Sequence, residues 1–188
     1  MNEAKTDRNR LRDWLGGRAG KGLAGAALLW VAKWAVVVAF VFAGCGPIGP
    51  IPGGALEGEM GPAVVRDWSF ANGAENAQLE TRPDDPHSVN TWWGSVDGQL
   101  YVPTSMILGP KDPEGRSWVA HVSEDDRVRI RLGDRVFERR ALRLPYGGFE
   151  YETARRAIEA RYDIAVADRD PERTVWIYRL NRVRRGSG

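Results

Sequence analysis

The chain has 188 residues, of which 43% are hydrophobic and 28% are charged, which suffices for one folded domain and an additional segment but not for two ordinary domains. The formal net charge is +2, yet residues 1–44 carry seven basic residues against three acidic ones, whereas residues 46–188 carry twenty against twenty-two. The larger part therefore has no net positive field to attract nucleic acid, and the single cysteine, Cys45, excludes an intrachain disulfide and a cysteine-based zinc site.

The N-terminal part of the sequence predicts attachment to a membrane. Residues 1–22 are basic, whereas residues 23–44 are apolar apart from Lys33 and are numerous enough to cross the hydrocarbon core as a helix. Because cationic residues resist translocation, we expect the N-terminus in the cytoplasm. The chain after Cys45 should then lie on the periplasmic or extracytoplasmic side of a bacterial cell envelope.

Two kinds of anchor fit this segment. The short apolar run Trp34–Phe42 leads into Ala-Gly-Cys45, which resembles a bacterial lipoprotein signal peptide and its lipobox. This resemblance implies that the chain is cut before Cys45 and that Cys45 carries a lipid. The alternative is an uncleaved transmembrane anchor in which Lys33 snorkels toward the membrane edge. In both cases membrane lipid is an expected partner.

The next segment, residues 45–60, is rich in proline and glycine, which disfavour the interiors of helices and sheets. We therefore expect it to be an extended, solvated tether. The folded domain is then expected to comprise residues 61–188.

Two hairpins form the framework of the predicted domain. In residues 88–105, strand-like alternation flanks Asp97-Gly98, a pair that accepts the positive φ angles of a type I′ turn. Residues 127–144 alternate in the same way around Gly133-Asp134. Two further strands are expected, at residues 77–82 and 174–180.

Two helices are expected between the strands. After the Pro- and Gly-rich loop 109–115, residues Ser117–Glu124 predict a short helix with Ser117 as its N-cap. Residues Glu150–Tyr162 predict a longer one, because their apolar residues recur at helical spacing. The complete prediction is a mainly β fold with two helices, arranged as a six-stranded antiparallel β-barrel and preceded by an N-terminal hydrophobic helix.

The predicted domain resembles the split β-barrel of the pyridoxamine-phosphate-oxidase-like, FMN-binding superfamily, in the segments VDGQLYVPTS, WVAHVSEDDRVRIRLGDRVFERRALRL, RYD and VWIYRL. The likeness covers about residues 77–180. It is closer to the deazaflavin-dependent nitroreductase-like branch and its uncharacterised relatives, whose pattern Trp118, Asp126-Arg127-Val128 and Ala141 match. The resemblance implies a homodimer that holds a flavin or deazaflavin at its interface. In place of the Gly-Arg-Lys-Ser-Gly-like loop of deazaflavin binders, this chain has Pro83–His87.

The resemblance also implies a set of cofactor-binding residues. A flavin phosphate is a dianion near neutral pH and needs cationic or hydroxyl donors. By their place around the first hairpin, those donors are Arg82, Thr104, Ser105 and Lys111, with Trp118 close to the ring. Without the resemblance, the interpretation is different. Arg82 and Lys111 would be ordinary charged residues of loops, Thr104 and Ser105 would end a strand, and Trp118 would be a core residue.

The sequence indicates no metal site and no nucleophilic site. His87 and His121 are the only histidines, so a metal site would need carboxylates from elsewhere in the chain, and the sequence shows no ligand-spaced pair. Ser88 and Ser117 have no evident activating base.

Two functional hypotheses remain. The first is a membrane-anchored, envelope-facing split-barrel protein of small-molecule-binding or structural type without a cofactor. It is favoured because phosphate ligands are sparse and because an exported chain would have to acquire its cofactor after translocation. The alternative is an FMN- or deazaflavin-dependent oxidoreductase acting on a small molecule, in which the protein supplies binding and the cofactor supplies the chemistry.

Overall fold

The computed structural model describes residues 46–164 and 170–183. The basic segment, the expected hydrophobic helix and Cys45 lie outside the described residues, so both anchors stay predictions. Within the described ranges, no helix combines the length and the apolar character needed to cross a membrane.

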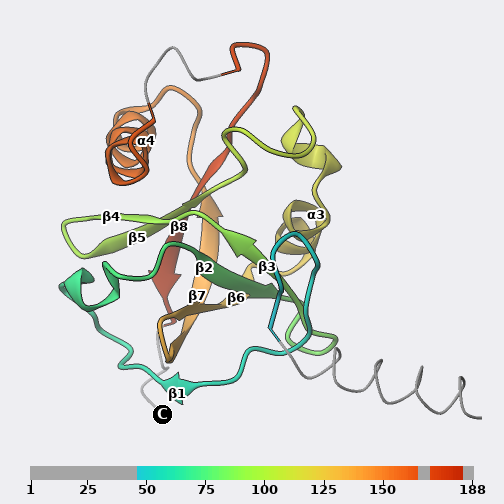
Figure 1. The fold of residues 1–188 in the computed structure, drawn as a ribbon, viewed down its shortest axis with the longest axis vertical. Helices are drawn as coiled ribbons and strands as arrows, with labels where there is room; N and C mark the ends of the chain where they lie inside the picture. The colour runs from blue at the N-terminus through green and yellow to red at the C-terminus, as the bar shows by residue number, and fades with distance from the viewer. Residues whose placement is uncertain (1–45, 165–169, 184–188) are drawn as a thin grey trace, which may run out of the picture. The chain divides into compact units, whose positions relative to one another are not determined.

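Eight strands form one sheet (Figure 1). They are β1 (Glu59–Met60), β2 (Ala77–Thr81), β3 (His87–Thr91), β4 (Gly94–Val96), β5 (Gln99–Pro103), β6 (Arg127–Leu132), β7 (Arg135–Arg143) and β8 (Ile177–Arg182). The order across the sheet is β3-β2-β6-β7-β8-β5-β4, and all neighbours in this order are antiparallel. The short β1 lies off this path and pairs in parallel with β7.

The sheet does not close into the predicted six-stranded barrel. Its two edges, β3 and β4, are not paired with each other. The strand expected at residues 88–96 is broken at Trp92 and Trp93, so that β3 pairs with β2 while β4 pairs with β5. Because only two residues join the edge strands, the sheet has to curl until its edges come near each other. The fold is therefore a split, mainly antiparallel sheet with eight strands.

A side chain from a distant part of the chain explains the break. The backbone N–H of Trp93 donates to the hydroxyl of Tyr162 (3.1 Å) instead of continuing a strand ladder. The indole of Trp92 stacks on the ring of Tyr162, with 4.3 Å between ring centroids. At Gly94, a Cβ atom would lie 2.8 Å from Cγ1 of Ile158, so the chain passes here too close to the neighbouring element for a larger residue.

Both predicted hairpin turns are confirmed. Asp97 and Gly98 have φ angles of 51° and 75° between β4 and β5, as a type I′ turn requires. Gly133 has a φ of 64° in the turn between β6 and β7.

The two predicted helices are also confirmed, as α3 (Ser117–Glu124) and α4 (Phe149–Arg161). Two single-turn 3₁₀ helices accompany them, η1 (Ser69–Ala71) and η2 (Pro113–Gly115). The predicted capping role of Ser117 is wrong: Arg116 occupies the N-cap position without a capping side-chain bond, and Ser117 is the first helical residue. The hydroxyl of Ser117 is engaged with another group, described below.

The sheet separates two hydrophobic clusters. The inner cluster fills the curled sheet and receives α3, and its large members include Leu79, Trp93, Leu100, Trp118, Ile130, Leu132, Phe137 and Leu180. The outer cluster lies beneath α4, which covers β4 and β8 (Figure 1), and contains Tyr101, Met106, Leu144, Tyr151, Ala154, Ile158 and Ile177. The alternation of β5 supplies both clusters, since Leu100 points inward and Tyr101 outward.

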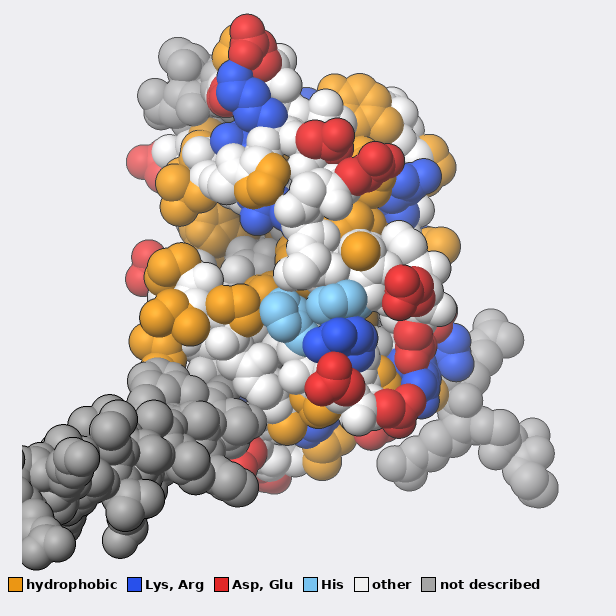
Figure 2. Space-filling model, turned by 90° about the vertical axis from the view of Figure 1, so that its right-hand side faces the viewer, with side chains coloured by type: hydrophobic (Ala, Val, Ile, Leu, Met, Phe, Trp, Pro, Cys, Tyr) orange, Lys and Arg blue, Asp and Glu red, His pale blue; other side chains and the backbone are white. Residues whose placement is uncertain are grey.

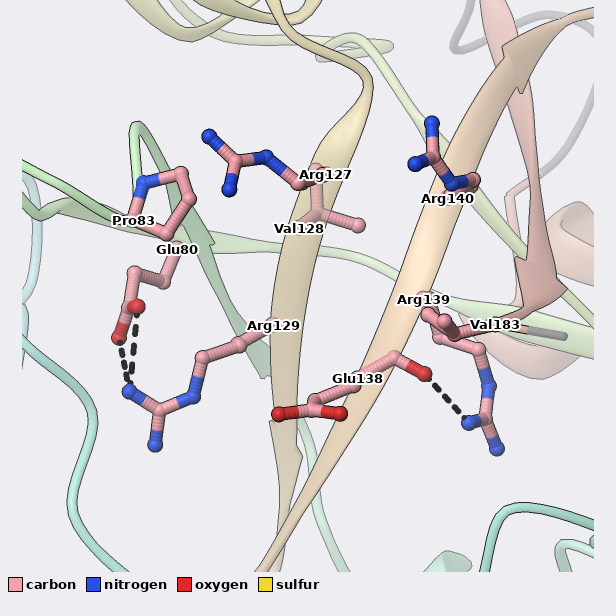
Figure 3. Close-up of a pocket in the computed structure, with 9 residues that line it drawn as sticks. All are labelled: Glu80, Pro83, Arg127, Val128, Arg129, Glu138, Arg139, Arg140 and Val183. Atoms are coloured by element: carbon pink, nitrogen blue, oxygen red, sulfur yellow. Dashed lines mark hydrogen bonds and ion pairs between the residues drawn. The ribbon is translucent and has the colours of Figure 1, made fainter. Parts of the chain in front are cut away.

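The segment 46–60 differs from the expected solvated tether. Leu56 is 2% exposed, its N–H donates to the carboxylate of Glu80, and its carbonyl accepts from Arg129 Nη2 (2.8 Å). Arg129 and Glu80 also form an ion pair of 3.2 Å, visible in Figure 3. The Pro- and Gly-rich backbone makes few hydrogen bonds with itself, and side chains of β2 and β6 supply partners instead. These residues therefore pack on the sheet.

Candidate functional site

A groove of about 700 Å³ runs between the docked N-terminal segment, the end of β3, the loop after β5 and the start of α3. It is lined by residues 49–52, 89–92, 107–110 and 115–118, with Asn76, Pro103 and Ser105. Proline, aliphatic and tryptophan side chains make up much of this surface. Such a pocket has the size and the character of a small-molecule site.

Two tryptophans, Trp92 and Trp118, are among the residues that line the groove. Trp118 is held in the inner cluster by an edge-on contact with Tyr178, whose ring centroid is 5.2 Å away. Trp92 is fixed by its stacking on Tyr162. Trp118 is only 4% exposed and reaches the groove with a small part of its ring, whereas Trp92 is partly exposed and offers a fixed aromatic surface.

Polar groups gather at the end of the groove where α3 begins. Arg116 donates from Nη2 to the carbonyl of Leu108, while its Nε is buried and has no hydrogen-bond partner among the described residues. Burial, and then the neighbouring guanidinium of Arg173, lower the pKa of Arg116. Ser117 lies next to it, with Oγ 3.1 Å from Nε2 of His87. This end of the groove is suited to an anionic group.

Both histidines lie beside this end. Their rings meet edge-on with 5.0 Å between centroids, and Figure 2 shows them side by side at the surface, next to basic and acidic side chains. The second ring, His121, is held by Thr81, whose Oγ1 lies 3.0 Å from Nδ1. Burial lowers the pKa of both imidazoles below the ordinary 6.5, and the guanidinium of Arg82 lowers both further. Both shifts favour the neutral imidazole, which at His87 Nε2 can share a hydrogen bond with the hydroxyl of Ser117.

The sequence did not reveal the contact between His87 and Ser117. The two residues are separated by 30 positions, and neither stands in a motif that predicts their meeting. Only the docking of α3 on β2 and β3 brings them together. Within the described ranges, no group of three or more His, Cys, Asp or Glu side chains is placed to hold a metal ion.

Of the five residues predicted for the cofactor, Ser105 and Trp118 line the groove. Oγ of Ser105 accepts from the backbone N–H of Leu108 (2.7 Å), which leaves its own proton free to donate. Thr104 is buried, and its Oγ1 accepts from the backbone N–H of Trp176 (2.8 Å).

The two predicted cations do not line the groove. Arg82 forms an ion pair of 3.0 Å with Asp85. Lys111 is paired with Glu172 and lies 3.5 Å from Asp170. The predicted set of four phosphate donors is therefore not brought together, and Arg116 is the arginine that faces the groove.

No family model and no curated protein matches the chain. Among solved structures, it is similar to a putative pyridoxamine 5′-phosphate oxidase from Listeria innocua, with 12% identity, a TM-score of 0.44, and coverage of 62% of this chain and 90% of that one. It is also similar to an F420-H2 dependent reductase (18%, TM-score 0.47, 57% and 95%) and to a conserved hypothetical protein from Mycobacterium tuberculosis (18%, TM-score 0.45, 67% and 86%). Similarity at this level carries no inference about the ligand of this chain.

Proposed function

We propose that the groove beside α3 binds a flat cofactor of the flavin or deazaflavin class, and that the protein uses it to oxidise or reduce a small molecule. The observation that supports this most is the distribution of polarity in the groove. Much of its lining is apolar, its one cationic residue is Arg116, and the hydroxyl of Ser117 follows directly, whereas Thr91 and Asn90 already donate to the backbone carbonyls of Pro103 and Gly49. A ligand with a flat ring system and a remote anionic group has the same distribution.

The residues present fit such a cofactor in a different way from the sequence-based expectation. Arg116, which lines the groove, would meet the phosphate together with the hydroxyls of Ser117 and Ser105. Trp118 and Trp92 would border the ring. When bound, the cofactor supplies the transfer of electrons, and the chain supplies binding, orientation and exclusion of water.

Titration of the purified full chain with FMN, and separately with a deazaflavin, tests this proposal through quenching of cofactor fluorescence. We expect saturable binding and a loss of affinity of about tenfold or more in Arg116→Gln, because one charge-assisted hydrogen bond is removed. Lys111→Gln should leave the affinity unchanged, since its ammonium group is paired with acidic residues outside the groove.

A second control separates binding from loop stability. Arg173 donates to the carbonyls of Leu108, Gly109 and Pro110 in the same loop but does not line the groove. If Arg173→Gln lowers the affinity for the cofactor as much as Arg116→Gln does, the loss of affinity comes from a disturbed loop and not from a lost contact with the cofactor. Absence of saturable binding for both cofactors would favour the other hypothesis, a binding or structural protein without a cofactor.

The expected homodimer and the membrane attachment stay predictions.

A further inference from the structure

Two pairs of arginines lie directly opposite each other on neighbouring strands. Arg127 on β6 is opposite Arg140 on β7, and Arg139 on β7 is opposite Arg182 on β8. Opposed residues of antiparallel strands project to the same face, and like charges in this position destabilise a sheet. Each pair is therefore stabilised by negative charge close by, and the need is greatest for Arg139, which is buried, whereas Arg127, Arg140 and Arg182 are exposed to solvent.

The first pair receives that charge from the chain itself. Arg127 Nη2 lies 2.6 Å from the carboxylate of Asp125 and 3.2 Å from that of Asp84. Arg140 pairs with Asp126. Both guanidinium groups are thus compensated, and this pair serves as an internal reference for the second one.

The second pair has no ion pair with any residue of the described ranges. Arg139 is 4% exposed, and its Nη1 donates to the backbone carbonyl of Glu138 (2.7 Å). Figure 3 shows its guanidinium directed away from the carboxylate of Glu138. Its Cζ lies 5.5 Å and 5.3 Å from the ring centroids of Trp68 and Phe137, contacts that favour a cation but do not neutralise it. Burial lowers the pKa of Arg139, in keeping with a charge that lacks a counter-ion.

A pocket of about 510 Å³ opens at this second pair. Arg139, Arg182 and Arg66 line it, and the one acidic residue in its lining is Asp97. Arg66 also makes no ion pair within the described part of the chain. The indole of Trp68 is 3% exposed at the base of the lining and is fixed by its Nε1 donating to the carbonyl of Gly98 (2.9 Å), while the exposed apolar side chain of the lining is Val64.

We propose that this pocket binds a small organic anion whose carboxylate or phosphate group lies between Arg139 and Arg182, with its apolar part against Val64. Guanidinium groups pair with both kinds of oxyanion through two parallel N–H bonds. The anion compensates the buried cation and relieves the repulsion between the opposed arginines. The pocket shares no lining residue with the groove beside α3, so this site does not rest on the proposed cofactor.

The test is a titration of the purified full chain with sodium benzoate and, separately, with inorganic phosphate, at an ionic strength kept constant with sodium chloride. We expect saturable binding by calorimetry and a rise in Tm for at least one of the two, and the stronger binder identifies the oxyanion. Arg182→Gln should weaken binding about tenfold or more. The matched control is Arg140→Gln, which belongs to the compensated pair and should bind as the unmodified chain does.

A second variant keeps the proposal testable at the buried position. Arg139→Met retains much of the side-chain length, and we expect it to abolish binding while leaving the ligand-free chain as stable as before or more so, since an uncompensated buried charge is removed. If Arg139→Met does not fold, the proposal is tested by the loss of anion binding in Arg182→Gln and Arg66→Gln. The proposal is overturned if neither probe binds beyond the effect of chloride, or if Arg182→Gln and Arg140→Gln behave alike.

Discussion

Glu80 is the acidic side chain on which the packing of the N-terminal segment depends. It is 2% exposed on β2, accepts the N–H of Leu56, and lies 3.2 Å from Arg129 Nη1. A buried carboxylate is tolerated only with partners of this kind. One residue thus joins a strand, its neighbouring strand and an irregular segment.

We predict that Glu80→Ala lowers the free energy of unfolding by about 3 kcal/mol, at the lower end of the range for breaking a buried pair, because Arg129 is itself partly exposed. Chemical denaturation measures the change. The matched control is Glu138→Ala, an exposed glutamate on β7 that lies opposite Arg129, whose effect should stay below about 1 kcal/mol. Equal effects of the two variants would contradict the role given to Glu80.

The sequence predicted part of the candidate site. The other contacts could not be predicted because they join residues that lie far apart in the chain. Ser105 and Trp118 reach the groove because they flank elements that the alternation pattern had located. The pairing of Arg82 with Asp85 is local and could have been anticipated from their i, i+3 spacing. The partner of Lys111 is Glu172, 61 positions away, which no local pattern reveals.

At the scale of elements, the two hairpin turns differ in what surrounds their glycines. Gly98 has a φ of 75°, and a Cβ atom there would lie 2.7 Å from the carbonyl oxygen of Arg66. Gly133 has a φ of 64°, but a Cβ atom would meet nothing within 4 Å. A residue with a Cβ atom would therefore cause backbone strain and a collision in the first turn, but backbone strain alone in the second.

This difference predicts which of the two glycine substitutions lowers the free energy of unfolding more. Gly133→Ala should lower the free energy of unfolding by roughly 1 kcal/mol, the cost of a left-handed backbone for a residue with a Cβ atom. Gly98→Ala should cost more, because the backbone of Arg66 also has to move, and Gly98→Val more again. Thermal and chemical denaturation of the variants check this ranking, and a Gly98 variant as stable as the Gly133 variant would refute it.

Regular elements were predictable because their signals are local. Helix α4 and the β6–β7 hairpin follow from periodicity and turn residues a few positions apart. The break at Trp92 and Trp93 was missed because the alternation continues through it. Its cause is the hydroxyl of Tyr162, which accepts a hydrogen bond from the backbone N–H of Trp93. The two residues are 69 positions apart in the sequence. Gly94 inside the expected strand was the one local sign.

For the whole molecule, the docked N-terminal segment changes what an anchor at Cys45 would mean. The carbonyl of Pro47 accepts from the side-chain amides of Gln78 (3.2 Å) and Asn90 (3.3 Å). Among the described residues, contacts with the sheet are thus already present at Pro47, two positions after the cysteine. An anchored domain would be held close to its attachment point rather than at the end of a loose tether.

We predict that Cys45 is lipidated and is the first residue of the mature protein. Intact-mass measurement of protein extracted from membranes should show the loss of residues 1–44 and a gain of acyl mass, and Cys45→Ser should abolish both. A full-length, unmodified mass would favour the uncleaved anchor instead, and Cys45→Ser would then leave the attachment unchanged.

The packing of residues 46–60 also determines the order in which the chain can fold during synthesis. Leu56 needs Glu80, 24 positions later, and Arg129, 73 positions later. Until the ribosome has made β6 and β7, the segment can contact only β2 and β3, β1 lacks the strand with which it pairs, and Glu80 lacks the guanidinium of Arg129. Contacts this distant in sequence form slowly. The first part of this domain to be synthesised is consequently among the last to reach its native position.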